Sequence, residues 1–291
     1  MLNQQDVRLL THLSIGGTSA ATRAMSAALR RARLQGSGLE FHEYRHYQPG
    51  DDPRTIDWTI EARLQQLVVR VARADGHLAL HALVDASASM SLGAPDKFSF
   101  ARRVAAALCY VALERRDSAG VATFDHDVRA RLAPATGREH LLQVLETLDS
   151  QQTSGRSDLT AALTRYGTGA RGPGLAVVIS DFLTPVVDLS GLDFLIYRGL
   201  APAVIQVLAP EETEPSFDLA ELFDVENAGA IGLVVDRAAI AAYQVRLRAH
   251  QDTLRTSCAE RGIPFLSLDS SSPFERVLRG LEEIGLLGRR D

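Results

Sequence analysis

From Leu67 onward, short apolar segments alternate with amphipathic segments along the chain. The nearly unbroken apolar run at residues 175–182 is typical of a strand that is buried on both faces of a parallel sheet. Apolar side chains at helical spacing, as in residues 97–115 and 237–260, predict helices between such strands. This alternation predicts an α/β fold: a doubly wound, mostly parallel sheet with helices on both faces.

The same pattern predicts the remaining elements. The predicted strands cover residues 67–73, 78–85, 120–124, 128–133, 175–182, 203–209 and 264–268, and the predicted helices cover residues 97–115, 138–149, 158–167, 188–198, 237–260 and 273–286. The short polar gap between residues 67–73 and 78–85 predicts a β-hairpin. Residues 120–124 and 128–133 predict a second strand pair, and residues 222–235 suggest a hairpin at an edge.

The segment before Leu67 has a different pattern. Residues 1–35 carry a weak helical pattern, whereas polar, charged and aromatic residues are interleaved without a period in residues 36–66. We interpret the second part as an ordered, irregular or β block, with Trp58 as its packing anchor. The predicted organisation is a block of residues 1–66 that packs on a main domain of residues 67–291.

The composition of the chain argues against several classes of function. The 291 residues carry a formal net charge of −5, which argues against a nucleic-acid binder that neutralises phosphates. Lys97 is the only lysine among 31 basic residues, an imbalance that we attribute to genome composition or thermal habit. The N-terminus shows no signal-peptide pattern, and no run approaches the ~18–20 apolar residues of a membrane span. We expect a cytoplasmic protein without membrane insertion, with Cys109 and Cys258 as buried free thiols.

Oxygen-bearing side chains follow the predicted strands at the edge where ligands bind in such sheets. Asp85, Ser87 and Ser89 leave one strand, and Asp181 ends another. Ser157 lies on a loop that opens a predicted helix. Five oxygen donors without sulfur or imidazole are typical of a site for Mg²⁺ or Mn²⁺.

Two resemblances rest on these residues. The DASAS, GRSDL and ISDF segments resemble the metal-ion-dependent adhesion site of von Willebrand factor type A domains, with Ser157 in the place of a threonine. The upstream segment GSGLEFHEYRHYQPGDDPRTIDWTIEARL resembles the signature of the bacterial domain of unknown function 58 family. The resemblance implies a von Willebrand A-like fold, a metal held by Asp85, Ser87, Ser89, Ser157 and Asp181, and association with MoxR-class AAA+ ATPases.

The predicted function is therefore a non-enzymatic, metal-dependent protein-interaction module whose metal captures an acidic residue of a partner. Asp158 is left out of the ligand set, because an aspartate at this place often only compensates a helix dipole. No nucleophile elbow, P-loop or dinucleotide fingerprint is present. A phosphatase nucleophile at Asp85 would need a second carboxylate where Ser87 stands. The alternatives are a metal-dependent phosphoester hydrolase and a metal-free scaffold.

Overall fold

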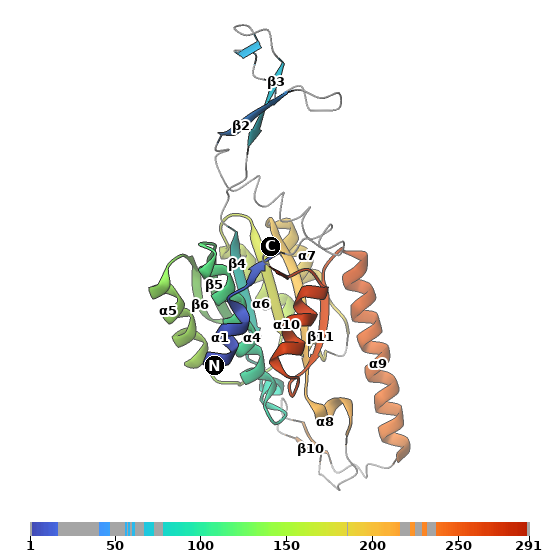
Figure 1. Cartoon of the computed structure of the whole chain (residues 1–291). Coiled ribbons are helices and arrows are strands. Elements are labelled where there is room, and N and C mark those ends of the chain that lie inside the picture. The colour runs from blue at the N-terminus through green and yellow to red at the C-terminus, as the bar shows by residue number, and fades with distance from the viewer. Residues whose placement is uncertain are drawn as a thin grey trace.

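The centre of the molecule is a six-stranded sheet with the strand order β11-β8-β7-β4-β5-β6 (Figure 1). The computed structural model describes residues 2–16, 41–46, 56, 58, 60, 61, 67–72, 78–184, 186–215, 222–224, 229–231 and 237–289. The strands of the sheet are β4 (Ala79–Asp85), β5 (Ser118–Phe124), β6 (Val128–Ala135), β7 (Gly174–Ser180), β8 (Leu200–Leu208) and β11 (Phe265–Asp269). All neighbouring strands run parallel except β5 and β6, which pair antiparallel.

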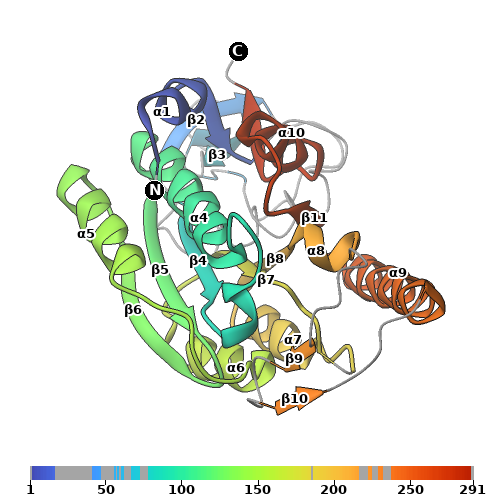
Figure 2. The same cartoon turned by 90° about the horizontal axis from the view of Figure 1, so that it is seen from below.

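Helices cover both faces of this sheet (Figure 2). One face packs against α1 (Gln4–Leu10), α4 (Lys97–Glu114), α5 (Arg138–Asp149) and α10 (Phe274–Glu283), and the other packs against α6 (Leu159–Gly169), α7 (Ser190–Tyr197) and α9 (Arg237–Glu260). All residues of β7 and β8 are buried, because each strand places apolar side chains into both layers. The doubly wound α/β fold that the sequence predicted, with the mostly parallel sheet of the von Willebrand A resemblance, is confirmed.

The N-terminal residues are part of the main core. Strand β1 (Leu13–Ile15) pairs antiparallel with β12 (Leu287–Arg289), near the other end of the chain. Leu10, Leu13 and Ile15 are buried in the same cluster as α4 and α10. Asp6 accepts two hydrogen bonds from the guanidinium group of Arg103, at 2.6 and 3.0 Å, and so ties α1 to α4. Residues 17–40 lie outside the described part of the chain, and the division at residue 66 stays a prediction.

The predicted hairpin between residues 67–73 and 78–85 is wrong. Strand β3 (Val68–Ala72) pairs antiparallel with β2 (Phe41–His46), in a ribbon that lies apart from the six-stranded sheet in Figure 1. Strand β4 instead lies between β5 and β7. Its side chains are buried on both faces of the sheet, as is typical of a central strand in a parallel sheet.

Other expectations can be compared directly with the described residues. Trp58 is not a packing anchor, because it is 61% exposed. Strands β9 (Leu222–Asp224) and β10 (Gly229–Ile231) form the antiparallel pair expected within residues 222–235, as a separate two-stranded sheet. Cys109 and Cys258 are buried free thiols, as predicted. Among the described helices, none combines the length and the apolar character needed to cross a lipid bilayer.

We expect Leu10→Ala to lower the free energy of unfolding by about 2–5 kcal/mol, because this leucine is 1% exposed in the main core. Urea unfolding followed by circular dichroism measures the loss. Leu142→Ala, at a position on α5 that is 58% exposed, is the matched control and should change the stability by less than about 0.5 kcal/mol. Equal small losses in both variants would contradict the packing of α1 on the core.

Candidate metal centre

The carboxyl ends of β4 and β7 bring the first two acidic positions together. These strands are parallel neighbours, and Val84 pairs with Ile179. The next residues, Asp85 and Ser180, therefore leave the sheet side by side, and Asp181 follows directly. Apart from the buried His81 in β4, both strands are apolar up to this point, so burial of their side chains fixes the register that aligns their ends.

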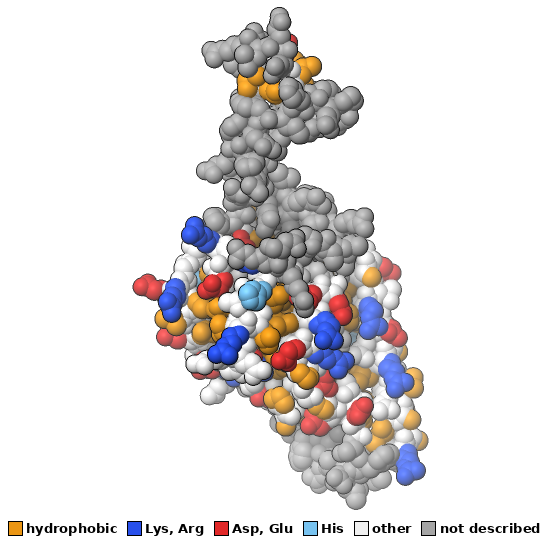
Figure 3. All heavy atoms as spheres, viewed as in Figure 1, with side chains coloured by type: hydrophobic (Ala, Val, Ile, Leu, Met, Phe, Trp, Pro, Cys, Tyr) orange, Lys and Arg blue, Asp and Glu red, His pale blue; other side chains and the backbone are white. Residues whose placement is uncertain are grey.

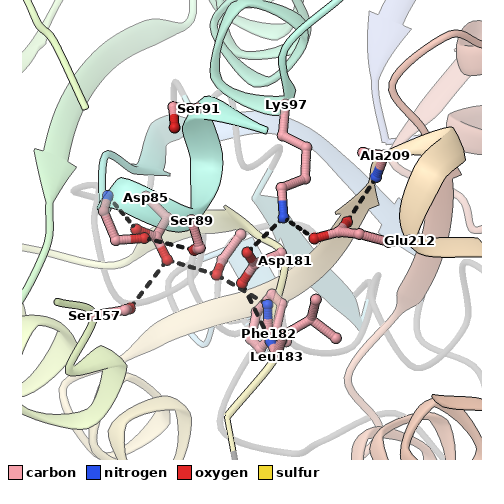
Figure 4. A network of polar contacts seen from close by, with 12 residues as sticks. Asp85, Ser89, Ser91, Lys97, Ser157, Asp181, Phe182, Leu183, Ala209 and Glu212 are labelled. Carbon is pink, nitrogen blue, oxygen red and sulfur yellow. Dashed lines mark hydrogen bonds and ion pairs between the residues drawn. The ribbon is translucent and has the colours of Figure 1, made fainter. Parts of the chain in front are cut away.

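Asp85 is fully buried and accepts three hydrogen bonds (Figure 4). One carboxylate oxygen, Oδ1, accepts from the backbone N–H of Ser87 at 2.8 Å. The other, Oδ2, accepts from the hydroxyl groups of Ser157 at 3.1 Å and Ser180 at 2.7 Å. Burial, together with the negative charge of Asp181, raises the pKa of Asp85 to about 6. Both effects disfavour the charged form of this carboxylate.

Besides Ser180, three further serine hydroxyls lie near this carboxylate. The Oγ atoms of Ser87 and Ser89 are 3.1 Å apart, at the start of the 3₁₀ turn η2 (Ala88–Ser91). Ser157 comes from a different loop, which backbone hydrogen bonds hold against the first. The N–H of Ala88 donates to the carbonyl of Gly155 at 2.9 Å, and the N–H of Ser154 donates to the carbonyl of Ala86 at 2.9 Å. Ser87 is buried, whereas Ser89 and Ser157 are partly exposed, so the hydroxyl cluster reaches the surface.

A buried ammonium group occupies the other side of the site. The Nζ atom of Lys97 lies 2.8 Å from Oδ2 of Asp181 and 2.6 Å from Oε1 of Glu212. Burial alone would lower the pKa of Lys97, but the charges of Asp181 and Glu212 hold it above its ordinary value. The second carboxylate oxygen of Glu212 accepts from the N–H of Ala209 at 2.8 Å, before the short helix α8 (Pro210–Thr213). Lys97 thus ties α4 to the ends of β7 and β8.

The five residues predicted as ligands lie at one edge of the sheet (Figure 4). Hydrogen bonds join Asp85, Ser87, Ser89 and Ser157, and the charge of Asp181 acts on Asp85. The described residues contain no cluster of three or more His, Cys, Asp or Glu side chains that could hold a metal. The site offers two carboxylates and three hydroxyls, a donor set that fits Mg²⁺ or Mn²⁺ and does not fit zinc or copper.

The charges at this edge also fit a divalent cation. Three mostly buried carboxylates, those of Asp85, Asp181 and Glu212, lie at this edge, and the ammonium group of Lys97 pairs with the last two. When all four groups are ionised, two negative charges remain uncompensated among them. Asp158, which we left out of the ligand set, caps α6 instead, because its carboxylate accepts from the N–H of Ala161 at 2.9 Å.

Sequence reasoning missed Lys97, Glu212 and the hydroxyl of Ser180. Lys97 could have been found, because it is the only lysine in a chain whose other Lys or Arg residues are arginine, and it begins a strongly apolar helix. Ser180 stands in the ISDF segment beside the predicted aspartate, which was a weaker signal. Glu212 is one of several acidic residues after β8, and only the fold shows which of them turns inward.

Phe182 connects the site to the next loop in a strained conformation. Its φ angle of 53° lies in the left-handed region, which costs a non-glycine residue about 1–3 kcal/mol. Two hydrogen bonds stabilise this conformation. The N–H of Phe182 donates to Ser180 Oγ at 3.1 Å, and Nε2 of His250 donates to the carbonyl of Phe182 at 2.7 Å. The sharp turn places Asp181 toward Lys97 and buries the phenyl ring of Phe182.

Comparison with known proteins gives a family match and distant structural likenesses. Residues 43–253 match the family model described as "Protein of unknown function DUF58". The uncharacterized protein Rv1480 of Mycobacterium tuberculosis is 31% identical over 241 residues, which cover 81% of this chain and 76% of that protein.

Two solved structures align with most of this chain at low identity. The conserved hypothetical protein BatB of Bacteroides thetaiotaomicron aligns over 71% of this chain and 98% of its own, with 14% identity and a TM-score of 0.45. The SpRpn10 VWA domain aligns over 72% of this chain and 97% of its own, with 12% identity and a TM-score of 0.41.

We expect Lys97→Met to lower the free energy of unfolding by about 3–5 kcal/mol, because the change leaves Asp181 and Glu212 buried without their ammonium partner. Urea unfolding in the presence of a chelator measures this loss. Arg255→Met removes an exposed ion pair with Asp252 and is the control, with an expected loss below about 1 kcal/mol. A loss in Lys97→Met no larger than that of the control would contradict the role of Lys97.

The raised pKa of Asp85 predicts a pH dependence in the metal-free protein. The folded state binds the Asp85 proton more tightly than the unfolded state, so stability falls as pH rises from about 4 through the folded pKa of about 6. Asp85→Asn does not titrate there. In chelator, the variant should gain stability relative to the wild type as the pH rises from 4.5 to 7.5, by about 2 kcal/mol. A stability difference that stays constant over this range would show that Asp85 is not the titrating group.

Proposed function

The chain belongs to the DUF58 family, and on that premise we propose that it is a non-enzymatic protein-interaction module that works through a bound Mg²⁺ or Mn²⁺ ion. Asp85, Ser87, Ser89, Ser157 and Asp181 would hold the ion. The partner would contribute an acidic residue, and a MoxR-class AAA+ ATPase or its client is the partner class that we propose, in complex assembly or maturation in the cytoplasm.

One observation carries this proposal: a fully buried carboxylate, Asp85, stands in a ring of serine hydroxyls beside two further carboxylates and a single ammonium group. Oxygen donors of modest charge suit a hard divalent cation. Because three of the five donors are neutral hydroxyls, a bound ion would be less neutralised than in an all-carboxylate cage, and an acidic side chain of a partner could complete its coordination.

The residues at the site have separable roles. Ser89 and Ser157 are partly exposed and would be the ligands nearest to a partner. Asp85 orients the Ser157 hydroxyl, which donates to it at 3.1 Å. The ammonium group of Lys97 pairs with one carboxylate oxygen of Asp181 and holds that side chain in place. The ion would supply the Lewis-acidic positive charge, and the protein would supply the rigid oxygen frame around it.

The burial of Asp85 supports binding over phosphoester hydrolysis. Both of its carboxylate oxygens already accept hydrogen bonds, and the side chain has no exposed surface from which it could attack a substrate. Lys97 is likewise fully buried between two carboxylates. The metal-free scaffold remains the alternative that the metal titration below separates from the proposal.

A local cation also suits the mixed charge of the protein surface. On the face that Figure 3 shows, basic and acidic side chains are interspersed over the described residues. The whole chain carries a formal net charge of −5. General attraction of an acidic partner by this protein would therefore be weak, and a metal ion would provide the specific positive point that such a partner needs.

We expect Mg²⁺ or Mn²⁺ to raise the stability of the wild-type protein by about 2.7 kcal/mol when the ion is present at 100 times its dissociation constant. Thermal unfolding with metal and with chelator measures this. Asp85→Asn and Ser89→Ala should lose most of the metal-induced shift. Ser91→Ala is the matched control, because Ser91 lies on the same 3₁₀ turn but its hydroxyl donates to the carbonyl of Ala88 (Figure 4).

Two outcomes would remove the metal from the proposal: no shift in the wild type at millimolar metal, or an equal shift in Asp85→Asn. Binding to a purified MoxR-class ATPase is then compared between wild type and Asp85→Asn in the same magnesium buffer, which avoids removing the ion that the ATPase itself requires. Equal binding by the two proteins would mean that the site does not contact this partner.

A further inference from the structure

A pocket of about 550 Å³ adjoins the candidate metal centre. Its volume lies within the range of about 300–1,000 Å³ that is usual for ligand pockets. Ser157 belongs both to the pocket lining and to the proposed ligand set. Two segments contribute to its lining. One is residues 156–160, which include Ser157 and the start of α6, and the other begins at Phe182, directly after Asp181. The same two segments therefore shape the metal centre and the pocket.

The floor and one wall of the pocket are apolar. Phe182, Leu189 and Leu254 line it and are almost completely buried, at 4%, 4% and 1% exposure. Val186 stands at the opening and is 74% exposed, which is unusual for a valine that borders a cavity. Val186 and the apolar part of the lining present a surface that gains free energy when another apolar side chain covers it.

The acidic groups of the pocket are already engaged. Asp158 accepts from the N–H of Ala161 at 2.9 Å, and Asp188 accepts from the N–H of Ser190 at 2.9 Å and from the hydroxyl of Thr160 at 3.0 Å. Both carboxylates thus serve the first turns of helices. Arg156 and His126 also line the pocket and are exposed to solvent, so the basic side chains lie at its mouth.

We propose that this pocket receives an aliphatic side chain that neighbours the acidic residue captured at the metal centre. The occupant is an extended segment of a protein partner with an acidic residue beside leucine, isoleucine or valine. The acidic group would lie at the ion and near Arg156, while the aliphatic group would cover Phe182 and Leu254. The inference rests on the proposed function, and it adds the feature by which the site distinguishes one acidic segment from another.

The test compares two short capped peptides, each with a central glutamate, one flanked by leucines and the other by serines. Fluorescence polarisation with labelled peptides and wild-type protein in Mg²⁺ should show about tenfold or tighter binding of the leucine peptide, because an aliphatic side chain leaves water on binding. Removal of Mg²⁺ should abolish binding of both peptides.

Val186→Glu places a charge at the rim of the pocket at an exposed position, and it should remove the preference for leucine without changing the metal-induced thermal shift. Val245→Glu is the matched control, because Val245 is 66% exposed on α9 and does not line the pocket. This control should keep both the thermal shift and the preference.

The outcomes separate the two claims. A metal-induced shift with equal affinity for both peptides, or with no binding of either up to about 1 mM, would overturn the inference and leave the proposed metal site standing. A leucine preference that survives in chelator would also overturn it, because the pocket would then act without the ion. The absence of any metal-induced shift would refute the proposed function itself.

Discussion

The burial of the Asp85 carboxylate is the constraint on which the edge of the sheet depends. A charged group without exposed surface must find hydrogen-bond donors nearby, and the donors come from three separate segments: Ser87 after β4, Ser157 in the loop before α6, and Ser180 at the end of β7. Each donor fixes the loop that carries it. One acidic side chain therefore organises the loops of neighbouring strands into a common surface.

The buried charges at this edge are stabilised in two different ways. The ammonium group of Lys97, on α4, pairs with the carboxylates of both Asp181 and Glu212, and these ion pairs stabilise the contact between a helix and the ends of two strands. Asp85 receives only neutral donors. The site thus has one half in which a single ammonium group pairs with two carboxylates, and another half in which Asp85 accepts hydrogen bonds from neutral donors alone. The second half is the one that reaches solvent through Ser89 and Ser157, and it borders the pocket beside Phe182.

The fold was largely predictable because burial on both faces leaves continuous apolar runs, as in residues 174–180, and because helices show a regular apolar stripe. Helix α9 was predicted with its observed bounds, Arg237–Glu260. The site was predictable only as far as strand ends meet by topology, which places Asp85 near Asp181. Contacts between distant segments determine the pairing of β3 with β2, the inward orientation of Glu212 and the position of Lys97. The local sequence pattern does not predict such contacts.

The placement of Lys97 has a chemical consequence for the whole protein. It is the only lysine in the chain, and it has no exposed surface. Reagents that acylate amines, and enzymes that attach modifiers to lysine, find no accessible lysine side chain on the folded molecule. Acylation at this position requires the start of α4 to open. The extent of acylation at Lys97, read by mass spectrometry, would report how often this edge of the sheet opens.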